Sequence, residues 1–151
     1  MADIEVIHSG SLDLEGLRDL AGRVAGMLQP GDRVFLVGDL GTGKSVFVRT
    51  VLRRLGVRGD IPSPSFVIDA IYSTRLGETH HLDLYRLEES TEELAALGLA
   101  DVLDAAGLVL VEWADRLPEE VLRRGWFVTL AMTEGADERM VTVERRALAG
   151  D

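Results

Sequence analysis

The sequence has 151 residues, a formal net charge of −10 and no cysteine. This length suits a single domain spanning 1–151, which can bury about 70% of its unfolded surface without disulfides or metals. The lack of thiols excludes a disulfide framework, a thiolate metal site and a cysteine nucleophile. The negative net charge opposes extensive direct binding of a polyanion such as tRNA.

The hydropathy pattern gives no sign of export or membrane insertion. No apolar run approaches the roughly 18–20 residues of a membrane span, and the first three residues lack the basic and apolar regions of a signal peptide. We therefore expect a cytoplasmic protein that does not associate with membranes.

The N-terminal part predicts a strand followed by a helix. Residues Ile4–His8 alternate in polarity and indicate a strand, and apolar residues at helical spacing predict a helix over 14–28. Ser9 or Ser11 is the expected N-cap of this helix. The Pro-Gly-Asp sequence at 30–32 ends it.

A glycine-rich loop lies between the buried apolar strand at 34–37 and a second helix, whose apolar residues begin at Val46. It fits the phosphate-loop pattern G-x-x-x-x-G-K-[ST] at every fixed position. Its residues are Gly38-Asp39-Leu40-Gly41-Thr42-Gly43-Lys44-Ser45. We expect its backbone N–H groups to bind phosphate oxygens.

Two side chains of this loop have distinct expected roles. Lys44 would reach the β and γ phosphates, and the Ser45 hydroxyl would bind Mg²⁺. Lys44 is the only lysine of the chain, because every other basic residue is arginine. We expect its side chain to face solvent, so that replacing it leaves the fold intact.

The C-terminal part predicts two antiparallel hairpins around a buried strand. A loop stiffened by Pro62 and Pro64 leads into the first hairpin, with strands at 66–72 and 79–85. Short helices follow between 94 and 103, then a buried strand at 108–111, a short helix at 118–122, and a hairpin with strands at 126–132 and 139–143. The sum is a small three-layer α/β domain of the P-loop NTPase type, with a mixed, mainly parallel central sheet and antiparallel hairpins.

Nucleotide hydrolysis needs a carboxylate for Mg²⁺ and a group that positions water. Glu112 follows the buried strand, where such folds place the metal-binding acid, or it is an ordinary strand-end glutamate. Asp83 is a candidate for the metal's water shell or the attacking water, or a turn aspartate. Ser65 can approach the γ-phosphate, or it belongs to a stiff connection. His80 and His81 point to opposite faces of one strand, so both are interpreted as structural.

Guanine-specific proteins generally use an Asn/Thr-Lys-x-Asp loop, and this chain has neither asparagine nor a second lysine. A small-molecule kinase needs an arginine-rich lid and an acceptor pocket. The candidates for the lid are Arg116, Arg123 and Arg124, and the length leaves little room for both features.

Four segments in series resemble the TsaE (YjeE) family of ATPases of tRNA threonylcarbamoyladenosine modification. They are the loop 38–45, Ser63-Pro64-Ser65-Phe66, the segment His81–Leu87, which resembles HxDLYRL, and Val111-Glu112-Trp113. Ser65 stands where the family usually has threonine, and Leu17 where its first helix commonly has threonine.

The resemblance implies a P-loop ATPase that is weak alone and works with the TsaB–TsaD pair, with tRNA reached only through that complex. It implies ATP and Mg²⁺ as cofactors, Ser45 and Glu112 as metal ligands, Asp83 as a functional carboxylate and Arg139 as a residue near the nucleotide. A stand-alone small-molecule kinase and a nucleotide-gated binding module remain the alternatives.

Overall fold

The computed structural model describes residues 2–62, 69–85, 98–135 and 137–148. Its centre is a seven-stranded sheet in the order β1-β7-β6-β2-β5-β4-β3. The strands are β1 (Ala2–Leu12), β2 (Arg33–Val37), β3 (Asp69–Thr74), β4 (Gly77–Asp83), β5 (Val109–Glu112), β6 (Gly125–Met132) and β7 (Arg139–Leu148).

The four central strands, β6, β2, β5 and β4, are parallel to one another. Antiparallel pairs flank them: β3 with β4 at one edge, and β6 with β7 and β7 with β1 toward the other. The predicted fold class, a mixed sheet with a parallel centre and antiparallel hairpins, is confirmed. β5 is buried at all four positions, as expected for a strand covered on both faces.

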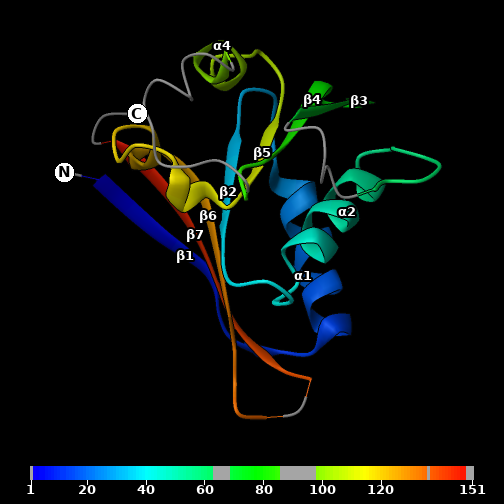
Figure 1. Cartoon of the computed structure of the whole chain (residues 1–151), viewed down its shortest axis with the longest axis vertical. Helices are drawn as coiled ribbons and strands as arrows, with labels where there is room; N and C mark the ends of the chain where they lie inside the picture. The colour runs from blue at the N-terminus through cyan, green and yellow to red at the C-terminus, as the bar shows by residue number, and fades with distance from the viewer. Residues whose placement is uncertain (1, 63–68, 86–97, 136, 149–151) are drawn as a thin grey trace.

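Helices α1 (Leu14–Met27) and α2 (Lys44–Arg54) lie side by side on one face of the sheet (Figure 1). Their buried side chains form one apolar cluster with alternate residues of the strands, including Leu36, Leu110 and Trp126. The other face packs a second cluster around Phe35, with α4 (Leu99–Leu103) and the 3-10 turns η1 (Ala114–Arg116) and η2 (Val121–Arg123). These two clusters make the sheet the middle of three layers.

Helix α1 begins at a different cap from the one the sequence predicted. Asp13 is the N-cap, and its Oδ1 accepts the backbone N–H of Gly16 at 2.7 Å. Ser9 and Ser11 instead lie within β1, where they pair with Thr142 and Met140 of β7. The expectation of a serine cap was therefore wrong, because pairing with β7 extends the strand to Leu12.

Arg33, the first residue of β2, forms hydrogen bonds with the backbone of residues 103–107, which precede β5. Its guanidinium donates to the carbonyl oxygens of Leu103 and Ala105, each at 2.6 Å, and of Gly107 at 2.9 Å. A planar fork of N–H donors suits several carbonyls at once. This contact fixes the approach of the chain to β5, whose far end carries Glu112.

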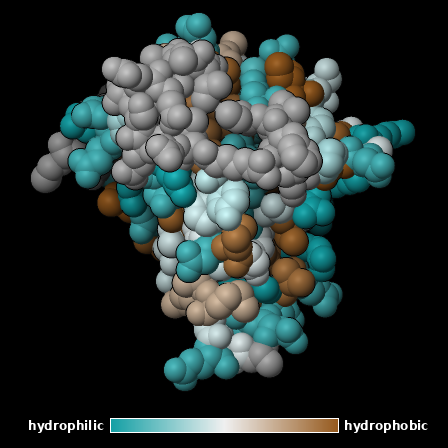
Figure 2. All heavy atoms as spheres, viewed as in Figure 1, coloured by the Kyte–Doolittle hydropathy of each residue, from teal (hydrophilic) through white to brown (hydrophobic). Residues whose placement is uncertain are grey.

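The surface mixes hydrophobic and hydrophilic side chains. On the face in Figure 2, brown, pale and teal residues are intermingled outside the grey atoms. Leu40, in the loop before α2, is 67% exposed and is the most exposed of the large hydrophobic residues among those described. In the part of the chain that the structure describes, no helix is both long and apolar enough to cross a membrane.

Candidate functional site

The loop from Gly38 to Ser45 connects β2 to α2 at the carboxyl edge of the parallel strands. Gly43 is the N-cap of α2 and has a φ of 111°, where a Cβ would also lie 2.6 Å from the Leu17 side chain. A Cβ on Gly38 would lie 2.5 Å from the backbone carbonyl oxygen of Leu130. Both positions therefore require glycine, and the loop packs directly on α1 and β6.

Two buried side chains hold the middle of the loop. The Thr42 hydroxyl donates to the carbonyl oxygen of Asp39 at 2.8 Å. The Arg139 Nε, from the start of β7, donates to the carbonyl oxygen of Thr42 at 3.1 Å. The structure thus places Arg139 against the backbone of the phosphate loop. A contact of Arg139 with nucleotide stays a prediction.

Lys44 is enclosed rather than solvent-facing. Its side chain is 5% exposed, and its ammonium donates to the carbonyl oxygens of Gly38 and Asp39, the latter at 2.9 Å. The ammonium also stands 4.2 Å from the centre of the Trp113 ring. Burial lowers the pKa of Lys44, against the opposing effect of Glu112 and Asp83. The expectation of a solvent-facing lysine was wrong.

Trp113 reaches Lys44 through an unusual backbone conformation. Its φ is 58°, in the left-handed region that residues with a Cβ rarely occupy, and its ring lies 5.0 Å from that of Tyr85. Such conformations occur preferentially at functional sites. Trp113 therefore forms one wall of the site.

The two predicted metal ligands meet beside the loop. The Ser45 hydroxyl donates to Glu112 Oε1 at 3.0 Å, and Glu112 is 2% exposed. Glu112 ends β5 and pairs with Leu36 of β2, the strand that leads into the loop. Mg²⁺ prefers hard oxygen ligands and generally takes only one or two from a protein beside phosphate and water. A hydroxyl and a carboxylate at this spacing fit that ion.

Asp83 lies at the end of β4, directly opposite Glu112 in the parallel register. Its Oδ1 accepts the backbone N–H of Tyr85 at 2.9 Å. Burial raises the pKa of Asp83, and the charge of Glu112 adds to this, while the Tyr85 N–H, His81 and Lys44 oppose it. The structure thus gathers Lys44, Asp83 and Glu112 at one edge of the sheet. Ser65 lies outside the described residues.

Asp83→Asn should raise the Tm at pH 7 slightly, by roughly 2 °C, since Asp83 is half-exposed and solvent screens its charge. The sign follows from the raised pKa. The folded protein holds the Asp83 proton more tightly than the unfolded chain does, so the contribution of Asp83 to stability is largest at low pH and is lost as the pH rises through the pKa of the folded state. The Tm difference between variant and parent should shrink in thermal unfolding scans as the pH is lowered from 7 toward the pKa of folded Asp83. Exposed Asp19→Asn is the control. A lower Tm for Asp83→Asn at pH 7 would contradict the assignment.

The sequence did not indicate that His81 lies beside Lys44, Asp83 and Glu112 in the candidate site. His81 Nε2 lies 2.5 Å from Glu112 Oε2, although His81 had been interpreted as merely structural. The prediction that the adjacent histidines face opposite sides is correct, because His80 Nδ1 instead pairs with Asp69 Oδ2 at 2.8 Å. Alternation along β4 could have indicated His81, since it lies two residues before Asp83 on the same face.

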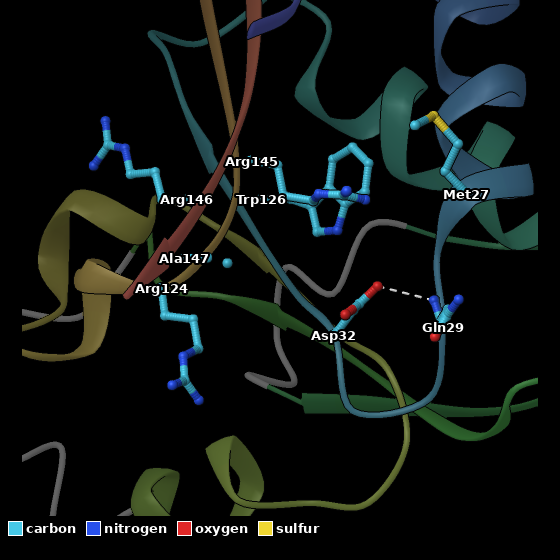
Figure 3. A pocket seen from close by; sticks show the side chains of 9 residues that line it. Met27, Gln29, Asp32, Arg124, Trp126, Arg145, Arg146 and Ala147 are labelled. Carbon is cyan, nitrogen blue, oxygen red and sulfur yellow. Dashed lines mark hydrogen bonds between the residues drawn. The ribbon is translucent and has the colours of Figure 1, made fainter. Parts of the chain in front are cut away.

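A hollow of about 650 Å³ lies at the end of the sheet opposite the phosphate loop, by the starts of β2 and β6 (Figure 3). Its arginines do not converge. Arg145 is directed toward Trp126, with its guanidinium 5.2 Å from a ring centre, whereas Arg146 points the other way, onto Phe127. Neither the phosphate loop nor Lys44, Asp83 or Glu112 lines this hollow, so it is separate from the candidate site.

A glycine-rich loop from a parallel strand to a helix, with an acid at the end of the next strand, defines a P-loop-type α/β protein. Similarity to known proteins supports the same class. The family profile of "Threonylcarbamoyl adenosine biosynthesis protein TsaE" matches residues 12–141. The chain belongs to the TsaE family.

Three relatives support this placement. The tRNA threonylcarbamoyladenosine biosynthesis protein TsaE of Bacillus subtilis is 35% identical over 85% of this chain and 78% of its own length. The protein of the same name from Streptomyces coelicolor is 38% identical, over 84% of this chain and 88% of its own. The crystal structure of Bacillus subtilis YdiB superposes with a TM-score of 0.76 at 27% identity, covering 96% of this chain and 87% of YdiB.

Proposed function

We propose that this protein binds and hydrolyses ATP with Mg²⁺ and acts with the TsaB–TsaD pair in the threonylcarbamoyladenosine modification of tRNA. The observation that carries the proposal is the hydrogen bond of Ser45 to the buried Glu112 beside a complete phosphate loop, in a chain of the TsaE family. The names of the relatives support the pathway. The cytoplasm stays the expected location.

In this proposal, different residues of the site bind the phosphates, hold Mg²⁺ and orient water. The loop N–H groups at the start of α2 and the Lys44 ammonium would bind the phosphates, and Ser45 and Glu112 would hold Mg²⁺. Mg²⁺, when bound, neutralises charge on the phosphate oxygens. Asp83, opposite Glu112, would orient a water or a metal-bound water. Lys44 must turn from the loop carbonyls to the phosphates for binding to occur.

The charge and the surface of the chain favour action on a partner protein. The hollow lined by Trp126 and Arg145 lies at the far end of the sheet, away from the phosphate loop, so it cannot serve as an acceptor pocket for a phosphate bound there. The net charge of −10 repels tRNA, and basic contacts must act within a Debye length of about 8 Å. We infer that tRNA is bound mainly by the partner complex.

The test is ATP hydrolysis by the purified protein, alone and with TsaB–TsaD, measured as phosphate release. We expect slow release alone, clear stimulation by the pair, and weak, nonspecific binding of the isolated protein to tRNA in filter assays. Phosphate transfer that depends on a small-molecule acceptor would identify a kinase instead. Tight ATP binding with no turnover in the complex would identify a binding module, and tight tRNA binding by the protein alone would refute the partner assignment.

A further inference from the structure

The Glu112 carboxylate has a different partner on each oxygen. Oε1 accepts the Ser45 hydroxyl at 3.0 Å, and Oε2 lies 2.5 Å from His81 Nε2. The Glu112 side chain is 3% exposed, so bulk water does not set its orientation. An ionised carboxylate only accepts hydrogen bonds, and we therefore assign the proton of this contact to His81 Nε2. This N–H fixes one oxygen and leaves the other toward Ser45.

The strand register makes this contact rigid. His81 pairs with Leu110 of β5, so Glu112 is its diagonal neighbour on the same face of the sheet. His81 is 1% exposed and lies in the middle of hydrogen-bonded backbone on both sides, next to β3 and β5. The ring thus has little freedom, and its position is transmitted to the carboxylate.

The other ring nitrogen argues against a role in stability alone. His81 Nδ1 is buried and has no hydrogen-bond partner among the described residues. A buried polar atom without a partner costs free energy, whereas an apolar side chain of similar size would not. Among the described residues, the ring therefore has one hydrogen-bond partner, Glu112, and its unpaired Nδ1 costs folding free energy.

We propose that His81 is a positioning residue that orients Glu112 for Mg²⁺ bound together with nucleotide. The inference rests on the proposed function, because it needs Glu112 to be a metal ligand. Its physical basis is the outer-shell effect, in which a group that holds a ligand changes metal affinity by about 10–100-fold.

The test uses three variants and measures metal binding directly. His81→Leu removes the N–H donor, and His81→Gln places an amide N–H at about the reach of Nε2. His80→Leu is the matched control, because His80 is also buried, also lies on β4 and also pairs with a carboxylate, but on the opposite face. Mn²⁺ affinity in the presence of ADP is measured by electron paramagnetic resonance, ADP affinity in EDTA by calorimetry, and folding by Tm.

We expect His81→Leu to weaken Mn²⁺ binding by about 10–100-fold while ADP affinity in EDTA changes less than about twofold. His81→Gln should restore most of the metal affinity, and His80→Leu should leave it unchanged even if the Tm falls. Metal affinity that is unaltered in His81→Leu, or lowered equally in His80→Leu, would overturn the inference. Absence of ADP-dependent Mn²⁺ binding in the parent protein would instead refute the proposed function.

Discussion

Lys44→Ala is expected to reduce ATP turnover by roughly 100-fold or more, with the fold intact. Removing one charge-stabilising donor from a transition state has effects of about this size. The side chain is buried against the loop carbonyls and Trp113, so its loss removes the cation nearest to the expected phosphates. Burial lowers the pKa of Lys44, which means that holding the ammonium charged costs folding free energy. Relief of this cost opposes the loss of the carbonyl and Trp113 contacts, so the Tm at pH 7 should change little.

Two further variants make the Lys44 result specific. Arg53→Ala removes a positive charge from the exposed far end of α2 and should leave turnover unchanged. Lys44→Arg keeps the charge but replaces a compact ammonium with a planar fork, so it should recover little activity. Phosphate release at the parent rate by Lys44→Ala would show that the loop is not the hydrolytic site.

The phosphate loop and its flanking elements could be predicted because their signal is local. Gly38 to Ser45 match a contiguous pattern, and the strand before it and the helix after it follow from hydrophobic periodicity. Strand β5 was also predictable, since a short, continuous apolar run between Gly107 and Glu112 suits a strand covered on both faces. The placement of Asp83 beside Glu112, by contrast, depends on β4 lying next to β5 in a parallel register.

The lengths of the outer strands could not be predicted, because they depend on distant pairing. β1 runs from Ala2 to Leu12 since it pairs with β7, at the other end of the chain. This pairing also takes Ser9 and Ser11 into the strand and leaves Asp13 as the cap. Local propensity favours serine and aspartate about equally at an N-cap, so only the sheet decides between them.

The enclosure of Lys44 and the contact of His81 with Glu112 needed the tertiary structure. Trp113 covers Lys44 only because its backbone adopts a positive φ, which no sequence pattern indicated. His81 reaches Glu112 because β4 is the neighbour of β5 in a parallel register. Strand order is a nonlocal property, so alternation could give the face of His81 but not its partner.

Glu112→Gln is expected to lower Mg²⁺-dependent ATP turnover by roughly 100-fold, equivalent to about 2.7 kcal/mol, and to change nucleotide affinity in EDTA by less than about twofold. Glutamine has the same shape, and its amide oxygen can accept the His81 N–H while its NH2 donates to the Ser45 hydroxyl oxygen, so both buried contacts and the fold persist. What it loses is the negative charge and one oxygen, which a divalent cation needs and a nucleotide without metal does not.

The measurements for Glu112→Gln are phosphate release across a Mg²⁺ titration and calorimetric ADP binding in EDTA. Exposed Glu119→Gln, seven residues later, removes the same charge away from the loop and should match the parent in both assays. If Glu112 is a metal ligand, higher Mg²⁺ should recover part of the lost turnover, because a weakened site fills at higher concentration. An equal loss of turnover and of metal-free ADP affinity, or no loss of either, would show that Glu112 acts through the structure rather than through the metal.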